Sequence, residues 1–271
     1  MTIQSFLHQA TALLEKQGVN TARLDCLVLL EDATGRERSW LLAHGDETVS
    51  PSNLRILQVQ IERRTKHEPL AYIRGKTEFY GREFLVNAHT LEPRPETEDM
   101  IDLLKALWQP EYKSWQIADI GTGSGAIGIT AALELSVTNI ELLDIDREAL
   151  ATAKQNAQNY GLELACHYGD LLDGNQSPYN IILTNLPYVP DSHTINQAAM
   201  QEPKHAIFGG PDGLDLYRRL FAQLQDRNHK PVYVLTESLP FQHEDLNLIA
   251  GKHGYSQKQA EGFIQVFELK P

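Results

Sequence analysis

The chain has 271 residues, 42% of them hydrophobic and 22% charged, which is typical of a globular protein with one large domain or with one large and one small domain. Residues 1–97 carry 12 Lys and Arg against 13 Asp and Glu, whereas residues 98–271 carry 12 against 23, so nearly all of the net charge of −12 lies in the second part. A surface that binds phosphates needs clustered cations, so this acidic part disfavours a nucleic-acid substrate.

The cysteines and the N-terminus indicate the cellular compartment. Cys26 and Cys166 lie in apolar surroundings, and we expect buried free thiols in a reducing cytosol rather than a disulfide. The first residues have the pattern of an amphipathic helix and not of a signal peptide, and no apolar run reaches the roughly 20 residues that span a bilayer. The histidines fall into no metal-ligand spacing. We therefore expect a cytoplasmic protein without a membrane segment or a metal site.

The first 66 residues are predicted to be helical. Apolar residues recur at helical spacing in three segments, which contain Phe6, Leu7, Ala10, Leu13 and Leu14, then Leu24, Leu27, Val28 and Leu30, then Leu54, Leu57, Val59 and Ile61. The second segment is expected to end near Gly35, and the third begins at Ser50-Pro51-Ser52, which supplies cap and first-turn signals. The alternation from Thr77 to Val86 around Gly81 predicts a β-hairpin.

Strand and helix patterns alternate from about residue 95 onward. The expected strands are Gln116–Ile120, Asn139–Asp144, a short one near Cys166, Tyr179–Thr184 and Val232–Glu237. The expected helices begin near Pro95 and Gly125 and span Arg147–Tyr160, Leu214–Arg227 and residues 242–253. Tyr255–Gln259 and Phe263–Leu269 suggest a closing antiparallel pair. Such alternation predicts a parallel sheet that helices cover on both faces.

A glycine-rich loop follows the first of these strands. It comprises Gly121, Thr122, Gly123, Ser124 and Gly125, directly after Asp119-Ile120. Glycines at the start of a helix let the backbone approach a ligand closely, and the helix N-terminus presents free N–H groups. The G-x-G-x-G spacing differs from the G-x-G-x-x-G of dinucleotide-binding folds. A tight turn that binds no ligand is the alternative.

Acidic residues end the next two strands. Asp144 lies about 20 residues beyond the glycine loop, where a carboxylate can accept hydrogen bonds from ribose hydroxyls. Asp146 is a better candidate to cap the helix that begins at Arg147. Asp170 could accept from an adenine amino group, although an ordinary loop aspartate is an equally good reading. The glycine loop and Asp144 together favour a cofactor that contains adenosine, but they do not distinguish S-adenosylmethionine from NAD.

The strand Tyr179–Thr184 leads into the turn Asn185-Leu186-Pro187-Tyr188. Ligands of open α/β sheets bind at such carboxyl ends. A planar amide or exocyclic amine is a poor nucleophile because its nitrogen lone pair is delocalised. The Asn185 side-chain oxygen and the Leu186 carbonyl could accept its N–H bonds and aim the lone pair at a methyl donor. Pro187 would direct the Leu186 carbonyl, and Tyr188 could stack on the planar group. The alternative is a strand-ending turn with a buried tyrosine.

These residues resemble the amino-methyltransferases, whose motif is usually Asn-Pro-Pro-Tyr. Within that group the chain is similar to the HemK/PrmC family of peptide chain release factor N5-glutamine methyltransferases. The match extends from about residue 69 to 237. It is carried by Pro69-Leu-Ala-Tyr-Ile-Arg-Gly75, Glu78-Phe-Tyr-Gly81, Pro93-Arg-Pro-Glu-Thr-Glu98, Gln201-Glu202-Pro203 and Gly209-Gly-Pro-Asp-Gly-Leu214.

The resemblance implies an α/β fold with a seven-stranded, Rossmann-like class I methyltransferase sheet and a small all-helical N-terminal domain joined by a β-hairpin. The expected domains are a substrate-docking domain at 1–75, a hairpin linker at 76–94 and a methyltransferase domain at 95–271. The substrate would be the glutamine of the Gly-Gly-Gln loop of class I release factors. The cofactor would be S-adenosylmethionine, released as S-adenosylhomocysteine. We expect a monomer that does not bind nucleic acid directly.

The resemblance also assigns site residues. The cofactor would contact Gly121, Thr122, Gly123, Ser124, Gly125, Asp144, Asp170, Leu171 and Asn185. The glutamine would be held, and the transfer carried out, by Asn185, Leu186, Pro187 and Tyr188. Arg94, Glu96 and Thr97 would lie near the mouth of the active site and bind substrate.

Leu186 stands where the family usually has proline. The substitution restores a backbone N–H and keeps the carbonyl acceptor. Because Asn-Leu-Pro-Tyr also occurs in ribosomal RNA adenine N6-dimethyltransferases, methylation of rRNA adenine is an alternative function. Glutamine methylation of a ribosomal protein is another, and a cofactor-binding regulator without transfer activity is a third.

Overall fold

The computed structural model describes residues 1–195 and 197–271, which form two compact units. One unit comprises Met1–Gly75 with a few residues that end at Gln201, and the other comprises Lys76–Ile195 and Glu202–Pro271. The hairpin that the sequence suggested as a linker belongs to the larger unit. Within the described ranges, no helix is both long and apolar enough to cross a membrane.

The N-terminal unit is helical, as its apolar spacing predicts. Thr2 caps the first helix by accepting a hydrogen bond from Ser5 N at 3.2 Å, and Ser50 caps the fourth by accepting from Asn53 N at 3.2 Å. The second helix ends at Gly35 in the left-handed conformation. The helices are α1 (Ile3–Lys16), α2 (Ala22–Thr34), α3 (Arg38–Ala43), α4 (Pro51–Thr65) and α5 (Leu70–Arg74). The short helices α3 and α5 were not expected.

The core of this unit contains most of the predicted apolar positions. Leu14, Cys26 and Leu57 are fully buried, but Leu13, Leu24 and Val59 are exposed. Val59 lies two residues from Leu57, about 200° around the helix, so both cannot face one core. The prediction of a buried thiol holds for Cys26, whereas Cys166, on an edge strand of the larger unit, is only half-buried. Both cysteines are free.

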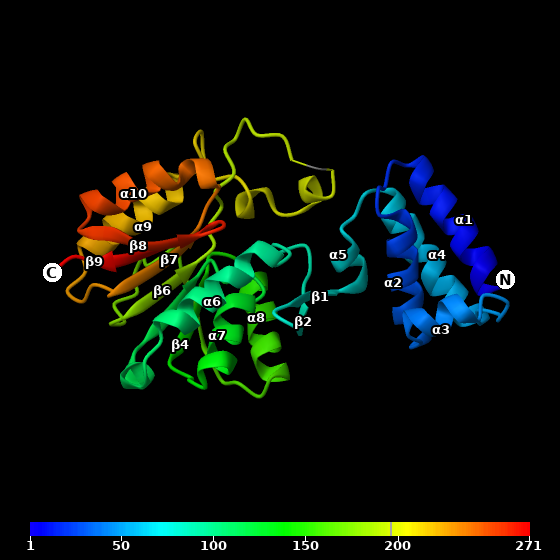
Figure 1. Ribbon diagram of the computed structural model, residues 1–271, viewed down its shortest axis with the longest axis horizontal. Helices are drawn as coiled ribbons and strands as arrows, with labels where there is room; N and C mark the ends of the chain where they lie inside the picture. Colours follow the sequence, from blue (N-terminus) through cyan, green and yellow to red (C-terminus); the bar gives the residue numbers. More distant parts are fainter. Residues whose placement is uncertain (196) are drawn as a thin grey trace. The chain divides into compact units, whose positions relative to one another are not determined.

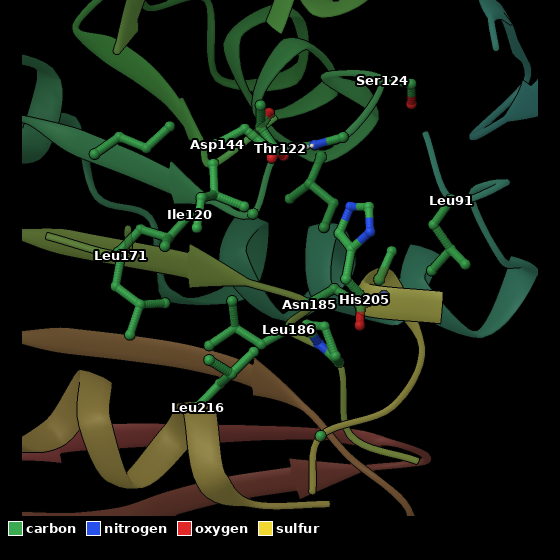
Figure 2. A pocket seen from close by; sticks show the side chains of 18 of the residues that line it. Leu91, Ile120, Thr122, Ser124, Asp144, Leu171, Asn185, Leu186, His205 and Leu216 are labelled. Carbon is green, nitrogen blue, oxygen red and sulfur yellow. Dashed lines mark hydrogen bonds between the residues drawn. The ribbon is translucent and has the colours of Figure 1, made fainter. Parts of the chain in front are cut away.

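The larger unit is built on a seven-stranded sheet of order β5-β4-β3-β6-β7-β9-β8. Strands β3 to β7 are parallel, and β9 and β8 close the sheet in antiparallel pairs. The strands are β3 (Ile117–Ile120), β4 (Ile140–Asp144), β5 (Ala165–Tyr168), β6 (Ile181–Thr184), β7 (Tyr233–Glu237), β8 (Tyr255–Glu261) and β9 (Ile264–Leu269). The predicted fold class is thereby confirmed. The carboxyl ends of β3, β4 and β6 border the pocket drawn in Figure 2.

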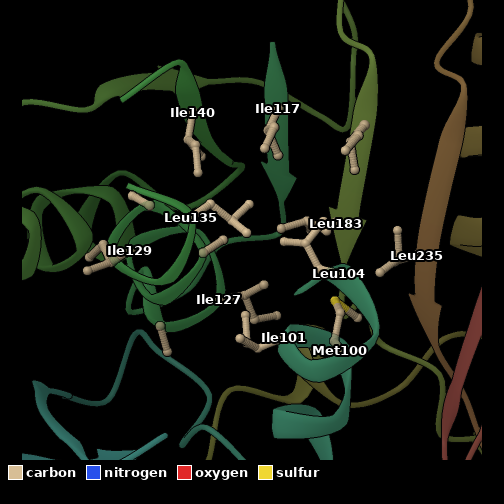
Figure 3. Close-up of a cluster of buried hydrophobic side chains, with 14 of the residues drawn as sticks. Met100, Ile101, Leu104, Ile117, Ile127, Ile129, Leu135, Ile140, Leu183 and Leu235 are labelled. Carbon is tan, nitrogen blue, oxygen red and sulfur yellow. The ribbon is translucent and has the colours of Figure 1, made fainter. Parts of the chain in front are cut away.

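Helices cover the sheet on both faces (Figure 1). Side chains on one face of the sheet, such as those of Ile117, Leu142 and Leu183, pack with α6 (Glu98–Leu107), α7 (Ala126–Leu135) and α8 (Arg147–Asn159). Figure 3 shows this cluster, with Met100, Ile101 and Leu104 of α6 beneath the strands. Side chains on the other face of the sheet pack with α9 (Asp215–Gln225) and α10 (His243–Lys252). This two-sided burial explains why the strands read as continuous apolar runs.

The hairpin β1 (Lys76–Phe79) and β2 (Arg82–Leu85) turns at Tyr80 and Gly81, which both have positive φ, and it buries Phe79 and Phe84 in the same cluster. Asn156 of α8 fixes it in place. Its side-chain oxygen accepts from Leu85 N at 2.8 Å, and its amide nitrogen donates to Leu85 O and to Ser124 O. The hairpin is thus tied to the glycine loop.

The contact of α7 with the sheet leads to a stability prediction. A Cβ atom at Gly128 would lie 2.5 Å from Leu142 Cδ2 and 2.9 Å from Asp119 Oδ2. Alanine favours a helix by about 1 kcal/mol over glycine, but overpacking costs about 1–3 kcal/mol. We expect Gly128→Ala to lower the free energy of unfolding in urea by about 1–2 kcal/mol.

Gly251→Ala is the matched control, because a Cβ atom at Gly251 in α10 would meet nothing within 4 Å. Its free energy of unfolding should equal or exceed that of the wild type. Equal destabilisation of the two variants would contradict the close contact at Gly128.

Candidate active site

The glycine loop is held against the end of the neighbouring strand. The N–H groups of Gly121 and Thr122 donate to Leu143 O at 2.9 and 3.0 Å, and Gly123 N donates to Asp144 Oδ2 at 2.8 Å. Gly121 and Gly123 have φ of 72° and 55°, a region that favours glycine. The spacing of the loop is therefore explained by the backbone conformation that it adopts.

Asp119 anchors the loop from below. Its fully buried carboxylate accepts from Thr122 Oγ1 at 2.6 Å and from Gly128 N at 2.9 Å. Burial raises the pKa of Asp119 to about 6. The group joins β3, the loop and the first turns of α7 in one hydrogen-bonded unit.

Asp144 and Asp146 have different roles, as the sequence suggests. Asp144 Oδ1 accepts from Asp146 N at 2.9 Å, and its Oδ2 accepts from Gly123 N, so the carboxylate is fixed at the border of the pocket. Burial raises its pKa. Asp146 caps α8 by accepting from Glu148 N at 2.7 Å and from Ala149 N at 3.3 Å, which confirms that prediction.

The loop after β5 brings two more predicted residues to the same pocket. Leu171 is buried with a φ of 56°, and Asp170 is half-exposed. Asp170 Oδ2 accepts from Arg219 Nη2 of α9 at 2.6 Å. Arg219 also lines the pocket, so an arginine that the sequence did not indicate lies beside the aspartate.

The turn after β6 lines the opposite side. Asn185, Leu186 and Pro187 border the pocket, and Asn185 Nδ2 donates to Thr97 Oγ1 at 3.2 Å. Figure 2 shows Asn185 and Leu186 across the pocket from Thr122 and Asp144. A Cβ atom on Gly121 would lie 3.1 Å from Leu186 Cδ2, so the glycine loop and the turn approach each other closely.

Leucine at position 186, where the family usually has proline, adds a backbone N–H, and this N–H has a hydrogen-bond partner. Its side chain is 3% exposed, and its N–H donates to Tyr217 Oη at 3.3 Å. Tyr217 is fully buried in α9, and its hydroxyl in turn donates to Glu237 O. The backbone N–H that proline would lack is therefore accommodated within the fold.

Tyr188 does not border the pocket. Its hydroxyl donates to Glu237 Oε1 at 2.8 Å, and burial together with the Glu237 carboxylate raises its pKa. Glu237 is fully buried, and burial raises its pKa although hydrogen bonding with Thr97, Tyr188 and Asn185 opposes this.

Of the three residues predicted to lie near the mouth of the active site, only one lines the pocket. Thr97 lines the pocket, whereas Arg94 and Glu96 do not. Glu96 is exposed in the 3₁₀ turn Pro95–Thr97 that precedes α6. Arg94 Nη2 donates to the buried Glu202 at 2.6 Å, an attraction that outweighs burial and raises the Arg94 pKa. Glu202 Oε2 also accepts from Glu92 N at 3.1 Å, so the Pro93–Glu98 motif is joined to the Gln201–Pro203 motif.

The pocket has a volume of about 440 Å³, within the range of small-molecule sites. Its apolar wall includes Leu143, Ile145, Leu171 and Leu216, and its polar groups converge from the glycine loop, Asp144 and Asn185. This set fits S-adenosylmethionine, whose adenine needs an apolar slot, whose ribose needs an acceptor and whose sulfonium favours a negative surrounding. In the parts of the chain that the structure describes, no group of His, Cys, Asp and Glu is arranged to hold a metal ion.

Several residues at the site were not predicted. His89, Leu91, Phe208, Leu216 and Arg219 line the pocket. Three further residues do not line the pocket but form hydrogen bonds with predicted site residues: Glu202 with Arg94, Tyr217 with Leu186 and Glu237 with Tyr188. For Glu237 a signal exists in the sequence, since an acidic residue ends the strand that follows the Asn185–Tyr188 turn.

Comparison with known proteins identifies both parts of the chain. The family model "PrmC N-terminal domain" matches residues 5–75, and the model "Methyltransferase small domain" matches residues 101–206. A release factor glutamine methyltransferase of Deinococcus radiodurans is 34% identical over 82% of this chain and 81% of its own length. A release factor glutamine methyltransferase of Bacillus subtilis is 34% identical over 87% of this chain and 84% of its own.

Solved structures agree on the fold. A methyltransferase from Pyrococcus furiosus superimposes with a TM-score of 0.52 at 16% identity, over 82% of this chain and all of that one. The resemblance that the motifs indicate is confirmed by the sequence relatives. The chain belongs to the family of release factor glutamine methyltransferases.

Proposed function

We propose that the chain transfers a methyl group from S-adenosylmethionine to the side-chain amide nitrogen of the glutamine in the Gly-Gly-Gln loop of bacterial peptide chain release factors. The observation that carries the proposal is one pocket in which the Asn185-Leu186-Pro187 turn faces the glycine loop and Asp144, in a chain of this family. The protein would act as a cytoplasmic monomer on a protein substrate.

The glycine loop side of the pocket would hold the cofactor. S-adenosylmethionine, when bound, supplies a methyl group on a positively charged sulfur. Asp144 would accept the ribose hydroxyls, since each carboxylate oxygen keeps a lone pair beyond its bond to Gly123 N or Asp146 N. Leu171 and the apolar wall would flank the adenine, and Asp170 Oδ1 would accept from its amino group.

The turn would hold the glutamine amide. Asn185 Oδ1 and Leu186 O would accept its N–H bonds, which leaves the nitrogen lone pair facing the methyl group. Pro187 favours an extended Leu186 and so directs that carbonyl. The Tyr188 hydroxyl donates to Glu237, and the ring, which does not line the pocket but is partly exposed directly after Pro187, would stack on the planar amide of the approaching substrate.

The alternative of an RNA substrate is disfavoured by the sequence relatives, which are release factor glutamine methyltransferases. That alternative rested on Leu186, whose carbonyl remains available and whose N–H is bonded to Tyr217. The excess of acidic residues after residue 97 also disfavours a nucleic-acid surface.

Labelling tests the proposed function. The protein is incubated with methyl-labelled S-adenosylmethionine and a bacterial release factor, and the methyl group is located by mass spectrometry. We expect label on the Gly-Gly-Gln glutamine and none on a release factor in which alanine replaces that glutamine. Ribosomal subunits and ribosomal proteins are tested in parallel. Label on them alone, with cofactor binding shown by calorimetry, would overturn the proposal.

Asp144 is predicted to control cofactor affinity. Asp144→Ala removes the ribose acceptor, and loss of hydrogen bonds to a charged group costs about 1.5–3 kcal/mol, so the Kd for S-adenosylmethionine should rise about 10–100-fold. Calorimetric titration measures it, and Asp226→Asn, at an exposed residue after α9, serves as the control. An unchanged Kd in Asp144→Ala would move the ribose contact to another residue.

Asn185 is predicted to control transfer. Asn185→Ala removes an acceptor for the glutamine amide, and misplacement of a reacting group costs about 100-fold in rate, so kcat should fall at least about 100-fold. The Kd for the cofactor should change by less than about threefold, because Asp144 and the glycine loop remain. Substantial residual transfer would mean that the amide is held elsewhere.

A further inference from the structure

A buried carboxylate lies directly behind the catalytic turn. Thr184 of β6 is paired with Thr236 of β7, so the next residues, Asn185 and Glu237, are neighbours at the carboxyl edge of the sheet. Glu237 is fully buried and does not border the pocket, so it cannot touch the cofactor or the substrate directly. Any influence it has on the reaction must pass through the residues around it.

The surroundings of Glu237 are polar but contain no cationic partner. Its Oε1 accepts from the Tyr188 hydroxyl, and Thr97 and Asn185 lie beside the carboxylate, whose Oε2 has no hydrogen-bond partner among the described residues. Across residues 1–195 and 197–271, no Lys, Arg or His forms an ion pair with it. A buried carboxylate without a cation is costly, so it depends on hydrogen-bond donors from its neighbours.

These neighbours fix which end of the Asn185 amide faces Glu237. A carboxylate only accepts hydrogen bonds, whereas an amide donates from nitrogen and accepts at oxygen. Nδ2 of Asn185 lies on this side and donates to Thr97 Oγ1 at 3.2 Å. The reversed amide would place Oδ1 beside a carboxylate, so that two acceptors face each other, which is unfavourable. Oδ1 is therefore directed away from Glu237.

We propose that Glu237 is a positioning residue whose acceptor-only carboxylate, together with Thr97, holds the Asn185 amide with Oδ1 toward the methyl acceptor. The inference rests on the proposed function, in which Oδ1 accepts an N–H of the substrate amide. Without Glu237, the Asn185 side chain could rotate about its terminal bond and present N–H donors to a substrate that itself donates. Glu237 also holds the Tyr188 hydroxyl, so both polar side chains of the turn depend on it.

An exchange of hydrogen-bond polarity tests this role. Glu237→Gln keeps the shape but can donate toward Asn185, and kcat on the release factor should fall about 10–100-fold with the cofactor Kd within about threefold. Asn185→Asp places two carboxylates side by side and should also lower kcat. In the double variant, the amide at 237 donates to the carboxylate at 185, and kcat should recover at least about tenfold over Asn185→Asp.

Glu163→Gln, at an exposed residue between α8 and β5, is the control for the change of carboxylate to amide and should leave kcat unchanged. A double variant as slow as the product of the two single effects would overturn the proposal, because a merely structural Glu237 provides no reason for recovery.

Thr97 gives a second comparison. Thr97→Val removes the hydroxyl and should lower kcat at least about tenfold more than Thr97→Ser, which retains it.

A measurement without substrate separates this inference from the proposed function. The side-chain amide of Asn185 is identified by NMR through its loss in Asn185→Asp, and its hydrogen exchange is compared with that of the exposed Asn20. We expect exchange at least about tenfold slower in the wild type, and faster in Glu237→Gln and Thr97→Val. Unchanged exchange in both variants would overturn the positioning role even if the release factor is methylated.

Discussion

Backbone hydrogen bonds between four parallel strands hold Leu143, Ile120, Thr184 and Thr236 in one row across the sheet. The residue after each of them is then Asp144, Gly121, Asn185 or Glu237. The proposed cofactor acceptor, the glycine loop, the turn proposed to bind the amide and the carboxylate beside it therefore meet because the strands end together, at the point where strand order reverses around β3. A shift of one residue in any of these pairings would separate them and would also turn each buried side chain to the other face.

Buried and partly buried carboxyl groups lie at the same edge of the sheet. Asp119, Asp144 and Glu237 all have pKa values that burial raises, that of Asp119 to about 6. Burial disfavours the charged form of each, and neighbouring donors compensate only in part, because Asp119 Oδ1 and Glu237 Oε2 have no hydrogen-bond partner among the described residues. A positively charged ligand beside Asp144 would favour its ionised form. The acidic bias of residues 98–271 thus has a local counterpart at the pocket, where a sulfonium is better accommodated than a phosphate.

Sequence patterns predict the parts of this site that are local in the chain. The glycine loop, Asp144 at a strand end and the Asn185–Tyr188 turn are each recognisable within a few residues, and the strands were placed to within two residues. The supporting contacts join residues distant in the chain, since Arg94 reaches Glu202, Tyr188 reaches Glu237 and Leu186 reaches Tyr217. Such pairs follow from strand order and register, which spacing along one sequence does not give. The same reason applies to Glu96, which a motif groups with Thr97 but which is exposed in the 3₁₀ turn before α6.

Leu186 shows how such long-range support can absorb a change in a motif. A proline at this position would fix φ and need no partner for a backbone N–H, whereas leucine loosens φ and adds a buried donor. In this chain the Tyr217 hydroxyl accepts that N–H at 3.3 Å and donates its own O–H to Glu237 O, and the leucine side chain packs within reach of Gly121. The Leu186 carbonyl, which we propose holds the substrate, is therefore constrained by packing and a hydrogen bond instead of by a ring. Tyr217 thus supplies the acceptor that leucine at position 186 needs. The replacement of proline by leucine therefore gives no reason to expect a different substrate.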